Sequence, residues 1–160
     1  MIRPYRPADA ESLWALKRGF ERGLGSGTGD GEKAAKYEAK LDDSYRGEYL
    51  DWVDRCVSEN ERAVQVASNG DELAGYVFVL PASLAYIWDA AVLNEVYVRP
   101  ADRGAGVGDR LMEAALSVAR AQELPLDRLV LDVDRENGRA RSFYDRWGFE
   151  HWGEMVARGL

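Results

Sequence analysis

The sequence predicts one mixed α/β domain, in which a mostly antiparallel sheet of about six or seven strands is flanked by about four helices. Three observations support this class. Apolar runs suited to strands alternate with amphipathic runs in the order β-α-α-β-β-β-α-β-α-β, with helices expected on both faces of the sheet. Asn69-Gly70 lies between two such apolar runs and indicates a hairpin. Finally, 160 residues fit a single domain spanning residues 1–160, because two halves would each have a marginal core.

The periodicity of the apolar residues predicts each element. Short apolar or β-branched runs predict strands over residues 1–5, 62–68, 72–80, 91–99, 129–133 and 149–156. Apolar residues at helical spacing predict helices that begin at residue 8 or 9, that include residues 45–56, and that cover residues 106–122 and 137–147. Alternate glycines over residues 23–31 predict an extended, mobile connection, with a lid over a ligand site as the alternative.

The composition is that of a globular protein with an acidic surface. Hydrophobic residues make up 46% and charged residues 31%, and the formal net charge is −7 with a pI near 4.8. Such a surface repels phosphate backbones, so nucleic acid is not expected as a partner, whereas a cationic amine or basic peptide would be attracted. Few of the basic residues are lysines, which fits a salt-adapted source and equally a GC-rich genome.

Neither export nor membrane insertion is expected. No window approaches the roughly 18 uninterrupted apolar residues that a membrane-spanning helix needs, and the first residues lack the apolar segment of a secretory signal. Cys56 is the only cysteine, so an intramolecular disulfide is excluded and the thiol is expected to be inert packing. These features predict a cytoplasmic protein. The sequence has no cluster of metal ligands, so no metal is expected.

The most informative segment is the glycine-rich turn from Arg103 to Gly108, which lies between an apolar strand and an amphipathic helix. Glycine lets the backbone turn tightly and approach a ligand without a Cβ in the way. The first N–H groups of the helix lack internal partners, and the helix dipole places about half a positive charge there. A diphosphate is the natural occupant, and Arg103 adds a charged donor.

Two other interpretations of this turn are possible. A dinucleotide-binding Rossmann unit would have glycines spaced G-x-G-x-x-G early in a parallel βαβ series. Here the glycines are spaced G-x-G-x-G, and three expected strands and two helices precede the strand that leads into the turn. The other interpretation is a glycine-rich connection that binds no ligand.

The segment Arg103-x-x-Gly106-x-Gly108 resembles the Q/R-x-x-G-x-G/A signature of the GNAT acetyltransferases, which bind the diphosphate of coenzyme A at this turn. The preceding run from Val96 to Pro100 resembles the strand that leads into it. Asp109 departs from what a phosphate site favours, and we expect its side chain to face solvent.

A second segment, from Asn137 to Phe149, resembles the N-x-x-A-x-x-F-Y-x-x-x-G-F pattern of the same family. Asn137 suits a helix N-cap, with coenzyme contact as a further role, and Gly148 suits the helix end. Both motifs stand in the expected order. The resemblance covers about residues 60–158 well and extends to residues 1–20, whereas residues 21–59, which shape the acceptor site in the family, carry no recognisable signature.

The resemblance implies the GNAT fold and transfer of an acetyl group from acetyl-coenzyme A, as co-substrate, to a primary amine in a ternary complex. It implies that Tyr144 protonates the departing thiolate and that a backbone N–H near Val96 binds the acetyl oxygen. It assigns coenzyme binding to Val96, Tyr97, Val98, Arg103, Gly104, Ala105, Gly106, Val107, Gly108, Asp109, Asn137 and Tyr144.

The site has to remove a proton from the acceptor before or during attack, because a lysine-like ammonium has a pKa of about 10.4. A general base would do this from the strand over residues 91–99, which is expected to form one wall of the acceptor cleft. Glu95 is the candidate, acting directly or through water, because the neighbouring Asn94 cannot act as a base. Side chains alternate along a strand, so one of the two should face the acceptor, and a β-bulge, common in this strand of the family, would decide which. His151, the sole histidine, is expected to be an exposed strand residue.

The acceptor is expected to be a small-molecule or peptide amine, whose identity the sequence leaves open. The alternative function is a module that binds coenzyme A or an acyl ligand without catalysis, which the presence of Tyr144 disfavours and Asn94 mildly favours. A homodimer is compatible with the family, although no interface is identifiable from the sequence.

Overall fold

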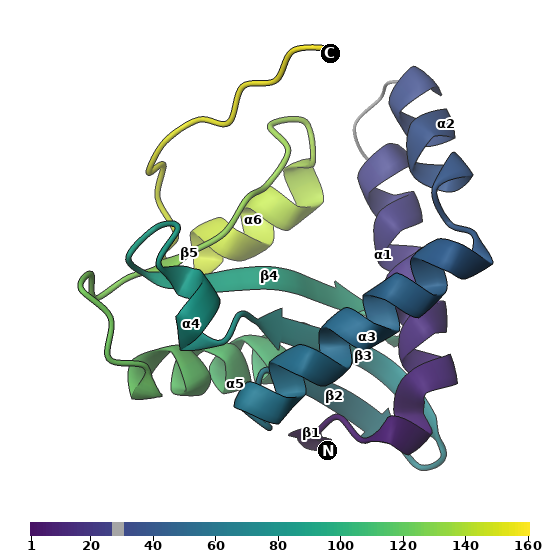
Figure 1. The fold of residues 1–160 in the computed structure, drawn as a ribbon, viewed down its shortest axis with the longest axis horizontal. Helices are drawn as coiled ribbons and strands as arrows, with labels where there is room; N and C mark the ends of the chain where they lie inside the picture. Colours follow the sequence, from purple (N-terminus) through teal and green to yellow (C-terminus); the bar gives the residue numbers. More distant parts are fainter. Residues whose placement is uncertain (27–30) are drawn as a thin grey trace.

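A five-stranded mixed sheet forms the centre of the computed structural model, which describes residues 1–26 and 31–160 (Figure 1). The strands follow one another in chain order across the sheet, and every neighbouring pair is antiparallel except the last, β4 and β5. They are β1 (Ile2–Pro4), β2 (Val64–Asn69), β3 (Glu72–Val79), β4 (Ala91–Val98) and β5 (Leu129–Val130).

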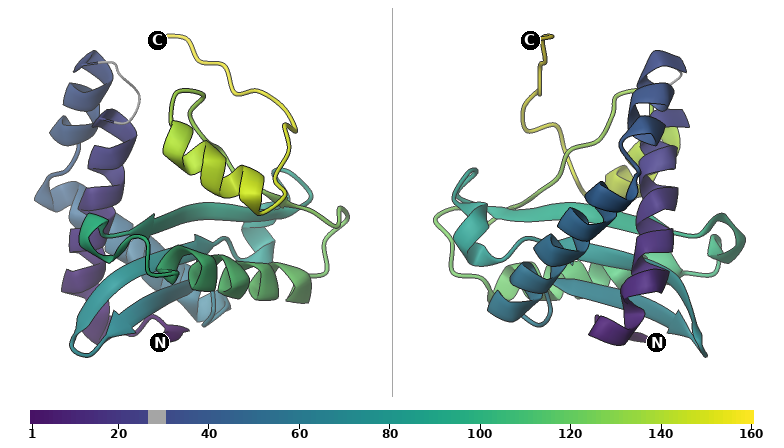
Figure 2. Two further views of the ribbon diagram at one scale, coloured as in Figure 1. Left: turned by 180° about the vertical axis from the view of Figure 1, so that it is seen from behind. Right: turned by 45° about the vertical axis from the view of Figure 1, so that its right-hand side comes forward.

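Helices cover both faces of this sheet, as the sequence predicts. Helices α1 and α3 lie on one face and α5 on the other, with α6 on the α5 side next to β4 and β5 (Figures 1 and 2). The α-helices are α1 (Ala10–Ser26), α2 (Gly31–Ala39), α3 (Asp43–Glu59), α4 (Ala82–Ala85), α5 (Val107–Ala121) and α6 (Gly138–Arg146), and the short 3₁₀ turns are η1 (Pro7–Asp9) and η2 (Pro100–Asp102).

Two apolar cores result, one on each face of the sheet. The α3-side core includes Leu13, Val53, Cys56, Tyr76 and Phe78, and the α5-side core includes Val77, Val79, Leu93, Leu111 and Met112. Alternate residues of β3 point into opposite cores, because successive side chains of a strand face opposite ways. The helix predicted to include residues 45–56 is α3, and its buried residues Tyr49, Val53 and Cys56 pack into the α3-side core.

The C-terminal strand predicted over residues 149–156 is wrong, which leaves five strands among the described residues where six or seven were expected. A strand needs a hydrogen-bonded neighbour, but β5 is only two residues long and pairs on one side with β4. The residues after α6 run as an irregular tail along that edge, and Trp152, Met155 and Val156 are exposed.

The predicted glycine-rich connection over residues 23–31 is also shorter than expected. Helix α1 continues to Ser26 and α2 begins at Gly31, while residues 27–30 lie outside the described part of the chain. Glycine costs about 1 kcal/mol in a helix relative to alanine, and packing of α1 against α2 offsets that cost.

Helices α2 and α4 were not predicted, because their apolar periodicity is short. None of the helices in the described ranges combines the length and apolar character needed to cross a bilayer.

Two irregularities of β4 determine the shape of the site. Its parallel pairing with β5 covers two residue pairs, Ala91 with Leu129 and Val92 with Val130, after which β4 continues to Val98 without β5. On its other side, the register with β3 shifts by one residue between Glu95 and Leu93, so Asn94 is an extra residue. The β-bulge expected in this strand is therefore present.

Helix α1 approaches β4 closely at Gly19. A Cβ added to Gly19 would overlap the hydroxyl and ring of Tyr97 on β4, whereas a Cβ at Gly23, one turn later in α1, would meet nothing within 4 Å. We expect Gly19→Ala to lower the free energy of unfolding by about 1–3 kcal/mol, because the Tyr97 ring must shift. Gly23→Ala, the matched control, should raise it by about 0.5–1 kcal/mol through helix propensity. Denaturant unfolding checks both values, and equal stability of the two variants would contradict the predicted contact.

Candidate active site

A cleft of about 1330 Å³ opens where β4 leaves β5, and its lining combines both sequence motifs. Its walls are the second half of α1, strand β4 from Leu93 to Val98, the glycine-rich turn, the loop after β5, and α6. The predicted site residues that line it are Glu95, Val96, Tyr97, Val98, Arg103, Gly104, Gly106, Gly108, Asp109, Asn137 and Tyr144. The cleft therefore brings together predicted site residues that are up to 49 positions apart, from Glu95 to Tyr144.

Two predicted residues lie outside this lining. Val107 is buried in the α5-side core, where it anchors the first turn of α5. Ala105 is exposed, and its carbonyl accepts a 3.4 Å hydrogen bond from Arg110. A role for either in coenzyme binding is thus confined to the backbone.

The glycine-rich turn has the backbone that the sequence pattern predicts. Gly104 and Gly106 have φ angles of +83° and +78°, a left-handed conformation that residues with a Cβ rarely adopt. Gly106 is the N-cap of α5, so the first N–H groups of that helix point toward the turn without intrahelical partners. Gly108 serves a different purpose, because a Cβ there would stand 3.3 Å from the ring of Phe143. Its absence lets α5 and α6 pack closely.

Two arginines, Arg103 and Arg139, line the cleft near the glycine-rich turn. The Arg103 Nε donates a 2.9 Å hydrogen bond to the Val98 carbonyl, and the guanidinium lies 5.6 Å from the centre of the Tyr97 ring. Burial and, second, the positive charge of Arg139 lower the pKa of Arg103. An anion between the two guanidinium groups would relieve this repulsion. Sequence reasoning missed Arg139, because it occupies a variable position of the second motif.

Asp109 faces solvent in part, as expected, but its carboxylate also has partners in the protein. Its Oδ1 accepts a 2.9 Å hydrogen bond from the Trp147 indole and lies 3.1 Å from the Arg146 guanidinium, while 40% of the side chain remains exposed. These donors follow from the packing of α5 against α6. The carboxylate is held to the side of the helix start and is balanced by a positive charge.

The second motif places Tyr144 in the cleft by way of a capped helix. Asn137 caps α6 by accepting a 3.2 Å hydrogen bond from the Ala140 N–H. The Tyr144 ring packs edge-on against Phe143 and Phe149, with centroids 5.5 and 5.6 Å away. Burial raises the pKa of Tyr144 to about 12, so the hydroxyl keeps its proton at neutral pH and can donate it.

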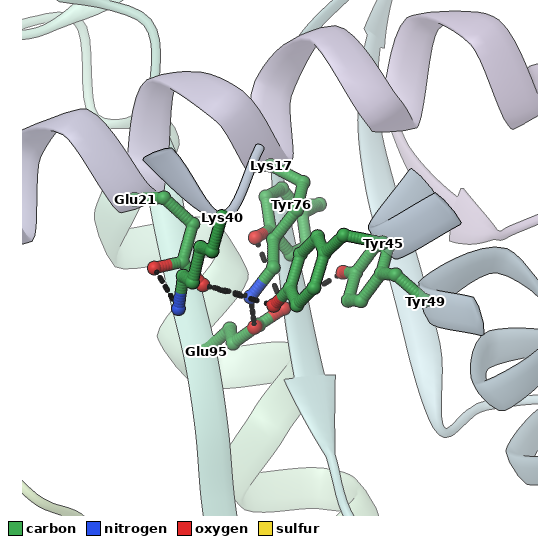
Figure 3. Close-up of polar contacts among 7 residues, drawn as sticks. All are labelled: Lys17, Glu21, Lys40, Tyr45, Tyr49, Tyr76 and Glu95. Atoms are coloured by element: carbon green, nitrogen blue, oxygen red, sulfur yellow. Dashed lines mark hydrogen bonds and ion pairs between the residues drawn. The ribbon is translucent and has the colours of Figure 1, made fainter. Parts of the chain in front are cut away.

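The bulge in β4 places Asn94 and Glu95 in different surroundings. Both line the cleft, but Asn94 is exposed whereas Glu95 is buried. Leu93 packs into the α5-side core, whereas the carboxylate of Glu95 points to the opposite face, between the sheet and helices α1 and α3 (Figure 3). Because Asn94 is an extra residue in the strand, the side chains of Leu93 and Glu95 face opposite sides of the sheet, whereas regular alternation would place them on the same side.

Glu95 belongs to a group of buried polar side chains, here named the charge array (Figure 3). The Glu95 carboxylate accepts hydrogen bonds from the Lys17 ammonium, from the Tyr49 hydroxyl at 2.7 Å and from the Tyr76 hydroxyl at 3.1 Å. Lys17 also lies 2.6 Å from Glu21. The members are Lys17, Glu21, Lys40, Tyr45, Tyr49, Tyr76 and Glu95.

The protonation states within the charge array follow from its contacts. Burial opposes the ammonium form of Lys17, but Glu95 and Glu21 outweigh this effect and raise the pKa of Lys17. Burial and the negative charge of Glu95 raise the pKa values of Tyr49 and Tyr76 well above 10. Lys17 is therefore held as a cation, and Tyr49 and Tyr76 remain neutral hydrogen-bond donors. Sequence reasoning missed Lys17, although a lysine at helical spacing from Leu13 and Phe20 was the available signal.

Other reactive side chains of the described residues offer no second centre. Burial raises the pKa of the Cys56 thiol to about 11, so it stays protonated, as expected for packing. His151 is exposed in the C-terminal tail rather than on a strand. Within residues 1–26 and 31–160, no three His, Cys, Asp or Glu side chains gather as a metal site requires.

Curated relatives share part of this sequence. The 5-NmdU N-acetyltransferase of Pseudomonas phage PaMx11 is 32% identical over 97 residues, which cover 61% of this chain and 64% of the relative. The mycothiol acetyltransferase of Beutenbergia cavernae is 44% identical over 75 residues, which cover 42% of this chain and 24% of the relative. The chain thus spans less than two thirds of the length of these relatives.

Solved structures share the fold across nearly the whole chain. The PaiA N-acetyltransferase from Thermoplasma acidophilum, in complex with coenzyme A, has a TM-score of 0.73 at 22% identity and covers 94% of this chain and 89% of its own. A GCN5-related N-acetyltransferase from Ralstonia eutropha has a TM-score of 0.70 at 19% identity, covering 99% and 97%. Residues 30–149 match the acetyltransferase (GNAT) family, and the chain therefore belongs to it.

Proposed function

We propose that this protein is an acetyl-coenzyme A-dependent N-acetyltransferase that moves the acetyl group to a primary amine within a ternary complex. The observation that carries the proposal is the shared cleft, in which an anion-binding helix start, a protonated tyrosine and a carboxylate line one space. Glu95 lies within β4, beyond its two residue pairs with β5, and the glycine-rich turn follows the end of the same strand.

The diphosphate of the coenzyme sits at the start of α5 in this proposal. The free N–H groups after Gly106 and the positive end of the helix dipole favour an anion there. Arg103 and Arg139 add two positive charges that repel each other when no anion lies between them. The rest of the coenzyme would extend along the edge of β4 that β5 leaves unpaired.

The transfer forms a C–N bond and breaks the C–S bond of the thioester. The amine loses a proton to Glu95, directly or through water, and a backbone N–H near Val96 stabilises the negative charge that develops on the acetyl oxygen. The departing sulfur takes a proton from the Tyr144 hydroxyl, which is protonated because its pKa is raised to about 12. Glu95 then carries an extra proton and Tyr144 lacks one, and proton exchange with solvent returns both groups to their starting states.

The acceptor is proposed to be a cationic small molecule or a basic peptide. Asp132 and Asp134, in the loop after β5, line the cleft together with Glu95, and the whole chain carries a net charge of −7. A screen of amines that monitors free thiol release from acetyl-coenzyme A tests the proposal. Coenzyme binding without thiol release in the presence of any amine would instead support a binding module.

Arg139 should contribute to affinity through the phosphates alone. We expect Arg139→Ala to raise KM for acetyl-coenzyme A about tenfold, as loss of one charge-assisted contact does. The KM for S-acetylpantetheine, which lacks the diphosphate, should stay unchanged. Steady-state kinetics with both donors checks this, and an equal rise for both donors would place Arg139 elsewhere in the mechanism.

Gly106 should be required for coenzyme binding. A valine there would be forced into φ +78°, which distorts the helix start, so we expect Gly106→Val to weaken coenzyme A binding at least about tenfold. Gly70→Val is the matched control, because Gly70 has φ +67° in the β2–β3 turn, outside the cleft. Titration calorimetry measures both. Unchanged affinity in a folded Gly106→Val variant would remove the assignment of the turn.

Tyr144 should act on turnover rather than on binding. We expect Tyr144→Phe to lower kcat about 10²-fold, because it removes the proton donor but keeps the ring, with coenzyme affinity unchanged within about twofold. Tyr86→Phe, at an exposed tyrosine outside the cleft, serves as the control. Thiol-release kinetics and coenzyme titration check the split, and full turnover in Tyr144→Phe would mean that another group protonates the sulfur.

A further inference from the structure

Glu95 is the link between the charge array and the cleft. It lines the cleft, whereas Lys17, Glu21, Tyr49 and Tyr76 lie behind it and do not. Lys17 is only 4% exposed and Glu21 only 3%. Lys17 and Glu21 can therefore influence the acceptor only through Glu95.

The hydrogen bonds of Glu95 leave one position open. Each carboxylate oxygen has two lone pairs. Within residues 1–26 and 31–160, Oε1 accepts from both Tyr49 and Tyr76, whereas Oε2 accepts from Lys17 alone. The remaining lone pair of Oε2 is the position at which Glu95 can take a proton from an amine or a bridging water.

The charges around Glu95 alternate in sign. Lys17 separates Glu95 from Glu21, and Lys40 lies 2.9 Å from Glu21 on the far side. The other groups that face this cluster are neutral hydroxyls, from Tyr45 and Tyr49 of α3 and Tyr76 of β3. Without the Lys17 ammonium, two buried carboxylates would face each other with no cation between them.

We propose that Lys17 is a positioning residue for the transfer reaction, which holds Glu95 ionised and directs the open lone pair of Oε2 to the acceptor. This inference rests on the proposed function of Glu95 as the base. It assigns to α1 a part in catalysis through a residue that does not touch the substrate. Glu21 has the opposite effect in this proposal, because it brings a negative charge to the same ammonium that contacts Glu95.

The proposal predicts pH shifts of opposite sign in two variants. The base has to be ionised to take a proton from the amine, so its loss at low pH gives the acid limb of kcat/KM. Lys17→Met removes the cation and should move this limb upward by about 1–3 pH units. Glu21→Gln removes the neighbouring anion and should move the limb downward by a smaller amount. A role in packing alone would not shift the two limbs in opposite directions.

The experiment measures kcat/KM against pH by thiol release, with the amine that gives the highest rate in the screen. Lys17→Arg retains a cation and should restore a limb close to that of the unaltered protein. Lys36→Met is the charge-matched control, since Lys36 is 74% exposed and paired with Glu32 outside the cleft. Its acid limb should not move. Circular dichroism and thermal unfolding establish that each variant is folded.

The outcomes separate the two levels of the proposal. If Glu95→Gln is inactive but the limb of Lys17→Met stays in place, the role of Lys17 is wrong and that of Glu95 stands. If Glu95→Gln is fully active, Glu95 is not the base. Should Lys17→Met fail to fold, Glu21→Gln carries the test alone: a downward shift supports the inference, and an unchanged or raised limb overturns it.

Discussion

The separation of β4 from β5 is the constraint on which the rest of the site depends. Parallel pairing stops after two residue pairs, and β4 then continues with one edge free of β5. Backbone groups cannot stay buried without partners, so such an edge has to face solvent or a ligand. The glycine-rich turn, α1, the loop after β5 and α6 surround this gap and turn it into a cleft. A fully paired sheet of the same strands would have neither the cleft nor the free edge.

The bulge at Asn94 adds a second constraint, because it divides the functions of neighbouring residues on one strand. Leu93 packs under α5, and Glu95 faces α1 and α3, although regular alternation would put both on one side. Strand β4 therefore carries the carboxylate of Glu95 in its middle and leads into the glycine-rich turn at its end. Gly19 completes this arrangement, since its lack of a Cβ lets α1 lie against Tyr97 next to Glu95.

Local motifs made the part of the cleft formed by the glycine-rich turn and α6 predictable from sequence, whereas the part formed by α1 depends on long-range packing. Positive φ at Gly104 and Gly106 and the N-cap at Asn137 are local properties of a few residues, and they were predicted with nearly correct helix bounds. The contacts of Lys17 with Glu95 and of Arg146 with Asp109 span 78 and 37 positions and carry no local signal. The predicted C-terminal strand failed for a related reason, because alternation in residues 149–156 does not provide a neighbour to pair with.

The position of the charge array is itself informative. Burying Lys17, Glu21 and Glu95 costs several kcal/mol of desolvation per ion, and well-packed apolar side chains of similar volume often stabilise a fold as much or more. Leu13, Val53 and Phe78 fill the adjacent α3-side core in that way. Packing therefore does not require charges at this place. Their net charge is zero, yet the array ends on the one member that reaches the cleft, Glu95, with a lone pair free. An arrangement that is costly for folding and ends at the reaction space is accounted for by the chemistry of the carboxylate.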